Sequence, residues 1–92
     1  MTKAEIVNSI SKSTGIEKAT TLAVVEAFMD TVKDSLAKKD PVYLRGFGSF
    51  IIKHRAQKAA RNITAKTTVI VPAHDIPAFK PWDEFEKLVQ GK

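Results

Sequence analysis

Arg45-Gly46-Phe47-Gly48-Ser49-Phe50 marks the place where the pattern of this sequence changes, and a long cationic stretch begins there. Between residues 41 and 74 there is no Asp or Glu, whereas six cations occur: Arg45, Lys53, Arg55, Lys58, Arg61 and Lys66. Because the whole chain has a formal charge of +5, the remainder carries a net charge of −1. Positive charge confined to one part of a chain is typical of a protein that binds a polyanion, usually nucleic acid.

Length and composition indicate one small soluble domain that spans residues 1–92. The chain has no cysteine, which excludes disulfides and thiolate metal sites. The polar start, Met1 to Glu5, has no apolar run behind it, and no segment reaches the roughly 18–20 apolar residues of a membrane span. We therefore expect a cytoplasmic protein that does not act at a membrane.

Two helices are predicted before the cationic stretch, and together they form a helical body over residues 1–40. Thr2 and Glu5 form a capping box at the start of the first helix, and Thr14-Gly15 ends it. The second helix is predicted from near Glu17 to about Lys38. Its apolar residues are spaced by three and four, which is the period of a helix: Leu22, Val25, Met29, Val32 and Leu36.

After Pro41 the apolar period changes to two, which predicts a sheet and a β-ribbon arm over residues 41–75. The expected strands are 42–44 and 49–52, with a turn at 46–48, a reversal at 61–66 and a return strand at 67–71. Pro72 and Pro77 argue against a regular central strand. Residues 76–92 are therefore predicted to be an extended connector followed by a short helix that starts at residue 82 or 83 and ends at Gly91.

The apolar residues predict that one chain is not sufficient for a stable core. The arm has little apolar surface, which leaves roughly 75 residues for a core, near the size at which a single core is marginal. Those residues nevertheless include six large aromatic side chains: Phe28, Phe47, Phe50, Phe79, Trp82 and Phe85. We expect an obligate homodimer in which the two ribbons project together.

Three groups of residues resemble the HU/IHF family of bacterial histone-like DNA-binding proteins. Gly46 to Phe50 matches the motif G-F-G-x-F, Arg55 and Arg61-Asn62 fall at arm positions, and Ile76 to Phe79 matches the closing segment. The resemblance covers essentially the whole chain. It implies an α+β intertwined homodimer, with a helical body of two N-terminal helices and a short C-terminal helix, and a three-stranded sheet extended into a long β-ribbon arm.

The same resemblance implies architectural, largely sequence-independent binding and bending of DNA in the nucleoid, with the arms in the minor groove. The residues assigned to DNA contact are Lys3, Arg45, Lys53, His54, Arg55, Lys58, Arg61, Asn62, Ile63, Lys66 and Lys80. The residues assigned to the aromatic centre of the dimer are Phe28, Phe47, Phe50 and Phe79.

The arm tip departs from the family pattern. The family reads G-R-N-P-x-T-G there, with a proline that wedges between base pairs, whereas this chain reads Ala60-Arg61-Asn62-Ile63-Thr64-Ala65-Lys66. Ile63 therefore replaces the wedge proline, and both glycines are absent. Ile63 is either an apolar wedge, since isoleucine is among the residues that unstack base steps, or an incidental exposed side chain.

Other readings of the same residues stay open. The arm cations could be a solvated face, and the phenylalanines could stack on bases instead of building a core. A dimeric module that docks its basic ribbon on acidic proteins or on RNA is the alternative function. The sequence contains no pattern of catalytic residues, and His54 and His74, without cysteines or convergent carboxylates, do not form a metal site. We expect no cofactor and no small-molecule substrate; the expected partners are double-stranded DNA, RNA as a side activity, and a second copy or a paralogue.

Overall fold

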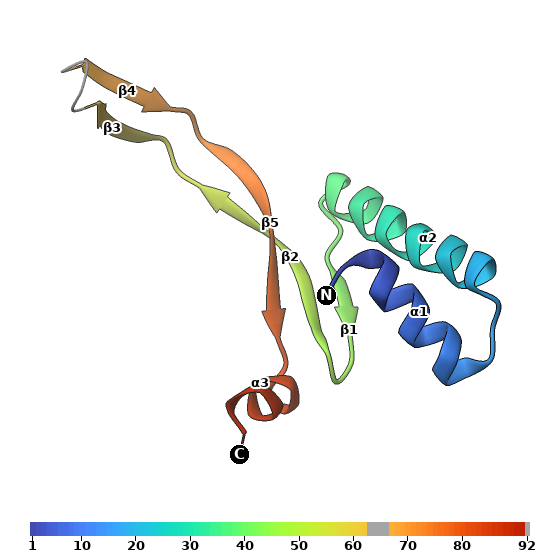
Figure 1. Cartoon of the computed structure of the whole chain (residues 1–92). Coiled ribbons are helices and arrows are strands. Elements are labelled where there is room, and N and C mark those ends of the chain that lie inside the picture. The colour runs from blue at the N-terminus through green and yellow to red at the C-terminus, as the bar shows by residue number, and fades with distance from the viewer. Residues whose placement is uncertain (63–66, 92) are drawn as a thin grey trace.

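The computed structural model describes residues 1–62 and 67–91, and the side chains of residues 60–62 and 67–69 are outside the description. Three helices accompany a three-stranded sheet that continues into a two-stranded ribbon (Figure 1). The elements in chain order are α1 (Lys3–Thr14), α2 (Lys18–Ala37), β1 (Val42–Leu44), β2 (Gly48–Arg55), β3 (Lys58–Asn62), β4 (Thr67–Val71), β5 (His74–Pro81) and α3 (Asp83–Gln90). The predicted α+β class is confirmed.

Helix α1 begins and ends where the sequence predicts. The Thr2 hydroxyl accepts a hydrogen bond of 3.3 Å from the Glu5 amide, which satisfies one of the unpaired donors of the first turn. Gly15 ends the helix with φ +77°, and its amide donates to the Ser11 carbonyl at 2.9 Å. Glycine adopts this left-handed conformation without the steric cost that a side chain would bring.

Helix α2 ends in a Schellman motif that has a lysine at the position usually taken by glycine. The Lys39 amide donates to the Leu36 carbonyl and the Asp40 amide to the Ser35 carbonyl, both at 2.9 Å. Lys39 has φ +64°, and it is the one residue other than glycine with positive φ in the described part of the chain. A side chain in this conformation costs roughly 1–2 kcal/mol.

The sheet has the order β1-β2-β5, and all its pairs are antiparallel. Strand β2 pairs with β5 from Gly48 opposite Pro81 to Arg55 opposite His74. Strands β3 and β4 resume the same register, with Lys58 opposite Val71. Two residues on each side interrupt the pairing without shifting it, so β2–β3 and β4–β5 form one long ribbon that leaves the body (Figure 1).

The prediction of an extended connector over residues 76–81 is wrong, because these residues belong to strand β5. Pro72 does lie in the interruption between β4 and β5, but Pro77 pairs with Ile52 inside the ladder. Strand β5 is at an edge of the described sheet. A proline is tolerated at an edge, because a missing N–H that faces away from the neighbouring strand breaks no ladder hydrogen bond.

A single chain buries very little. Among the side chains that the structure describes, Val7 is the one large apolar side chain that is buried, with 6% of its surface exposed. The radius of gyration is 18.7 Å, whereas a compact domain of this length has about 12 Å. The protomer is therefore an extended unit with unfilled apolar surface, which is the condition under which the sequence predicts a dimer.

Candidate nucleic-acid interface

The root of the ribbon is set by the turn between β1 and β2. The Phe47 amide donates to the Leu44 carbonyl at 3.0 Å, and Gly46 supplies the positive φ of +83° within that turn. Gly48 then lets β2 lie close to β5, since a Cβ at this position would meet the Phe79 ring and approach the Lys80 carbonyl oxygen to 2.7 Å. The glycines of the motif thus fix the point from which β2 runs outward.

Four phenylalanines gather beside this turn. Phe79 lies 5.0 Å from Phe50 and 5.1 Å from Phe47 between ring centroids, and Phe85 of α3 stacks on Phe47 at 5.3 Å. Three of the four predicted dimer-core residues therefore meet, and Phe85 joins them. Phe28 lies on α2, with 45% of its surface exposed in the single chain. The sequence had named Phe85 among the large aromatic residues available for a core, but had not assigned it to the dimer centre.

The register of β2 and β5 sorts the predicted DNA contacts onto two faces. Because directly paired residues point to the same side of a sheet, Lys53 and Arg55 share a face with Lys80, which pairs with Ser49. The opposite face holds Phe50, Ile52 and Pro77, and these residues line a groove of about 430 Å³ against Val32 and Leu36 of α2. The ribbon root thus has a cationic face and a face turned to the helix.

Among the described residues, the predicted cations of the ribbon and its root have no acidic partners. Within the described part of the chain, none of the following forms an ion pair with a carboxylate: Arg45, Lys53, Arg55, Lys58 and Lys80. Arg61 and Asn62 end strand β3, farther along the ribbon. Ile63 and Lys66 lie outside the described residues. A strip of uncompensated cations is well suited to phosphate groups.

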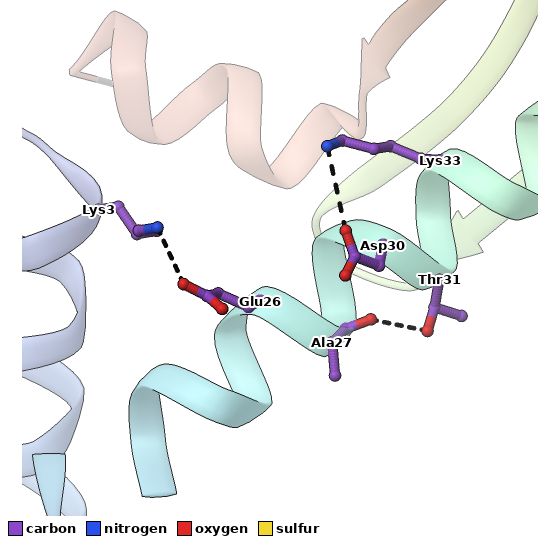
Figure 2. Close-up of polar contacts among 6 residues, drawn as sticks. All are labelled: Lys3, Glu26, Ala27, Asp30, Thr31 and Lys33. Atoms are coloured by element: carbon purple, nitrogen blue, oxygen red, sulfur yellow. Dashed lines mark hydrogen bonds and ion pairs between the residues drawn. The ribbon is translucent and has the colours of Figure 1, made fainter. Parts of the chain in front are cut away.

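Two predicted contacts occupy other places. Lys3 lies on α1, and its Nζ is 3.0 Å from Glu26 Oε1 of α2, so this cation is paired within the helical body (Figure 2). His54 lies on the face turned to α2, and its Nδ1 is 2.8 Å from Asp75 Oδ1. The structure thus does not bring Lys3 or His54 together with the cationic strip.

Asp75 is a residue that the sequence did not single out, although it is the first acid after the acid-free stretch. Its carboxylate accepts a hydrogen bond from His54 and lies 3.1 Å from Lys39 Nζ. These two hydrogen bonds, that of His54 first, lower the pKa of Asp75 below its ordinary value. Since an ionised carboxylate only accepts, the contact places a proton on Nδ1 of His54.

In residues 1–62 and 67–91, no three His, Asp or Glu side chains converge as metal ligands. Within those same ranges, none of the helices combines the length and apolar character that a bilayer crossing requires.

The fold and the cationic ribbon define a class of α+β protein that presents a basic β-arm. A family model described as "Bacterial DNA-binding protein" matches residues 1–90, and the chain belongs to this family. DNA-binding protein HU of Geobacillus stearothermophilus is 36% identical over 90 residues, which cover 98% of this chain and all of the relative. DNA-binding protein HU 1 of Bacillus subtilis is 32% identical over 92 residues, with full coverage of both chains.

Solved structures agree with this assignment. An Anabaena HU–DNA cocrystal structure superimposes with a TM-score of 0.94 at 29% identity and full coverage of both chains. A mutant of HU from Thermotoga maritima has a TM-score of 0.73 at 22% identity and covers 97% of this chain and 99% of its own, a likeness that concerns the fold.

Proposed function

We propose that the chain is a homodimeric architectural protein that binds and bends double-stranded DNA with little dependence on base sequence. The observation that carries the proposal is the cationic face of the ribbon, which Lys53, Arg55 and Lys80 share without an ion pair to any carboxylate in the described part of the chain. Contacts with phosphates supply affinity but no sequence information. Membership in the bacterial DNA-binding family supports the same function.

The dimer completes a core that one chain lacks. Apolar side chains on the body remain substantially exposed in the single chain, such as Val24 at 63%, Phe28 at 45% and Phe47 at 45%. An exposed apolar surface of this kind can be removed from water by packing against the same surface of a second copy. If folding and association are linked, the melting temperature rises with protein concentration. A cooperatively folded monomer at micromolar concentration would contradict the dimer.

The ribbons are proposed to lie in the minor groove, where base edges distinguish little beyond A·T from G·C pairs. A gel-shift panel with linear, nicked and kinked duplexes of several sequences tests this directly. We expect near-equal affinities among linear sequences and tighter binding to the nicked and kinked forms, because a pre-weakened duplex costs less to bend. A preference of several hundredfold for one sequence would overturn the proposal.

Ile63 is proposed as the wedge at the arm tip, a role that rests on its position in the family pattern. Isoleucine has a bulky, stiff side chain that can enter a base step, but its backbone is freer than that of proline. We expect Ile63→Ala to reduce bending and the preference for nicked duplex, and Ile63→Pro to increase both. Equal energy transfer across an end-labelled duplex for wild type and Ile63→Ala would remove Ile63 from this role.

The same cations would also attract an acidic protein or RNA, and the nucleic acid can be distinguished by competition. Bulk duplex DNA should displace labelled duplex at equal mass concentration far better than a polyglutamate chain or an A-form RNA duplex, because the ribbon fits the groove of B-DNA better than an A-form groove. Stronger displacement by polyglutamate would favour an acidic protein partner. Association with the nucleoid follows from the proposed DNA binding.

A further inference from the structure

Three charged or titratable side chains meet at the point where the ribbon leaves the body. Asp75 Oδ2 is 3.1 Å from Lys39 Nζ, and Asp75 Oδ1 is 2.8 Å from His54 Nδ1. The Asp75 side chain is 34% exposed, less than either partner. The Asp75 carboxylate therefore contacts the Lys39 ammonium and the His54 imidazole at the same time. We call these three residues the root cluster.

The root cluster joins three separate elements. Lys39 lies two residues beyond Ala37, the last residue of α2, whereas His54 belongs to β2 and Asp75 to β5. His54 and Asp75 are paired across the two strands of the ribbon root. Figure 1 shows that β2 and β5 pass the end of α2 as they run outward to the arm. The cluster thus links both strands of the ribbon to the end of the longest helix.

The backbone of Lys39 gives an independent reason to look for a role of its side chain. Lys39 adopts φ +64° at a position of the Schellman motif where glycine is the usual residue. A strained conformation that persists in a structure is a reason to ask what the residue contributes. Here the residue contributes the ammonium group that reaches Asp75.

We propose that Asp75 is a positioning residue, which holds Lys39 and His54 together and thereby fixes the direction in which the ribbon leaves the body. The consequence for DNA, that a fixed direction presents the cationic face correctly, rests on the proposed function. The root cluster lies on the face turned to α2, away from Lys53 and Arg55. Asp75 therefore acts through the geometry of the ribbon and not by contact with DNA.

The surrounding charges make Asp75 the centre of the cluster. Lys33 and Lys39 line the groove that Asp75 borders from the side of α2. On β2 and β5, Arg55 and His74 form a pair that points to the opposite face. Without the Asp75 carboxylate, Lys33, Lys39 and the His54 imidazole would remain on the inner face with no acid among them. Since both contacts are largely exposed, their effect on global stability is expected to be small, and their main effect is expected on ribbon direction.

Distance measurements between spin labels test the proposal on the free protein. The chain has no native cysteine, so labels at Lys18→Cys on α2 and Lys58→Cys on β3 are specific, and dilution with unlabelled chain leaves one labelled protomer per dimer. We expect Asp75→Asn and Lys39→Gly to broaden the distance distribution. Lys39→Gly suits the left-handed backbone, so it removes the ammonium without harming the helix end.

Matched controls separate positioning from a change of charge. Asp34→Asn removes an exposed carboxylate of α2, and Lys33→Ala removes a lysine whose Nζ lies 4.0 Å from Asp30 Oδ1. Both controls should keep the wild-type distance distribution. If the distance distributions of Asp75→Asn and Lys39→Gly were as narrow as that of the wild type, the proposal would be overturned.

Binding to a nicked duplex provides the second readout. Asp75→Asn and Asp34→Asn remove the same negative charge, so any general gain in affinity for DNA is shared. We expect Asp75→Asn to bind about two- to fivefold more weakly than Asp34→Asn, the range of an exposed ion pair, and to bend the duplex less. Equal affinity and bending would refute the positioning role. Failure of the wild type to bind any duplex would instead refute the proposed function, while the spin-label widths would still decide on Asp75.

Discussion

The helical body and the ribbon differ in what they leave exposed. The body exposes apolar side chains such as Val24 and Phe28, whereas the ribbon root exposes Lys53 and Arg55, which form no ion pair with a carboxylate of the described residues. Exposed apolar surface is removed from water by a protein partner, and uncompensated cations are neutralised by a polyanion. One small chain thus presents two interfaces of different chemistry, one for its own copy and one for DNA.

The largest loss of stability is expected from a change in the aromatic cluster of the body. Phe79 contacts Phe47, Phe50 and Phe85 within one aromatic cluster. Phe79→Ala should lower the free energy of unfolding by about 3–5 kcal/mol, because a large core side chain leaves a cavity. Chemical denaturation followed by circular dichroism measures this loss. The matched control is Tyr43→Ala on β1, whose side chain is 70% exposed, and an equal loss in both variants would remove the cluster from the core.

A smaller effect is expected where body and ribbon meet. Gly48→Ala would place a Cβ against the Phe79 ring and 2.7 Å from the Lys80 carbonyl oxygen. Overpacking of this kind costs typically about 1–3 kcal/mol. Gly15→Ala is the control, because its Cβ would meet nothing within 4 Å and only the left-handed backbone would be strained. Thermal unfolding at equal protein concentration should show the lower melting temperature for Gly48→Ala; the reverse order would contradict the close packing of β2 on β5.

The smallest effect is expected at the root cluster, and it depends on pH. The pKa of Asp75 is lowered by the hydrogen bonds from His54 and Lys39. A depressed pKa stabilises the fold above the ordinary value of about 3.9 and ceases to do so as pH falls through the acid range below it. Urea unfolding from pH 6 to pH 3 should therefore show a steeper loss for wild type than for Asp75→Asn. Parallel profiles of stability against pH would show that the contacts of the root cluster do not stabilise the fold in solution. The control Asp34→Asn should follow the wild-type profile.

The sequence predicted the body and the arm because their signals are local. Thr2, Glu5 and Gly15 determine the ends of α1 by themselves, and the absence of acids between residues 41 and 74 identifies the arm. Strand β5 was missed because Pro77 argues against a strand until the edge position of that strand is known. Local composition does not reveal which strand lies at an edge.

The site was predicted in part for a similar reason. Lys53, Arg55 and Lys80 were found from charge and family pattern, but the face of each residue depends on the register of β2 with β5. His54 was assigned to DNA contact as one more polar arm residue, and its pairing with Asp75 becomes visible only when residues 21 positions apart are brought together. The role of Lys39 depends in turn on the left-handed end of α2.

The salt dependence of DNA affinity tests the central claim, that the ribbon and not the body binds DNA, most directly. The measurement compares wild type with two double variants that lose the same charge: Lys53→Ala/Arg55→Ala on the ribbon and Lys12→Ala/Lys33→Ala on the helices. Each phosphate neutralised contributes about 0.9 to the slope of log affinity against log salt. The account predicts a slope shallower by about 1.8 for the ribbon variant and an unchanged slope for the helix variant. Equal slopes in both double variants would contradict it.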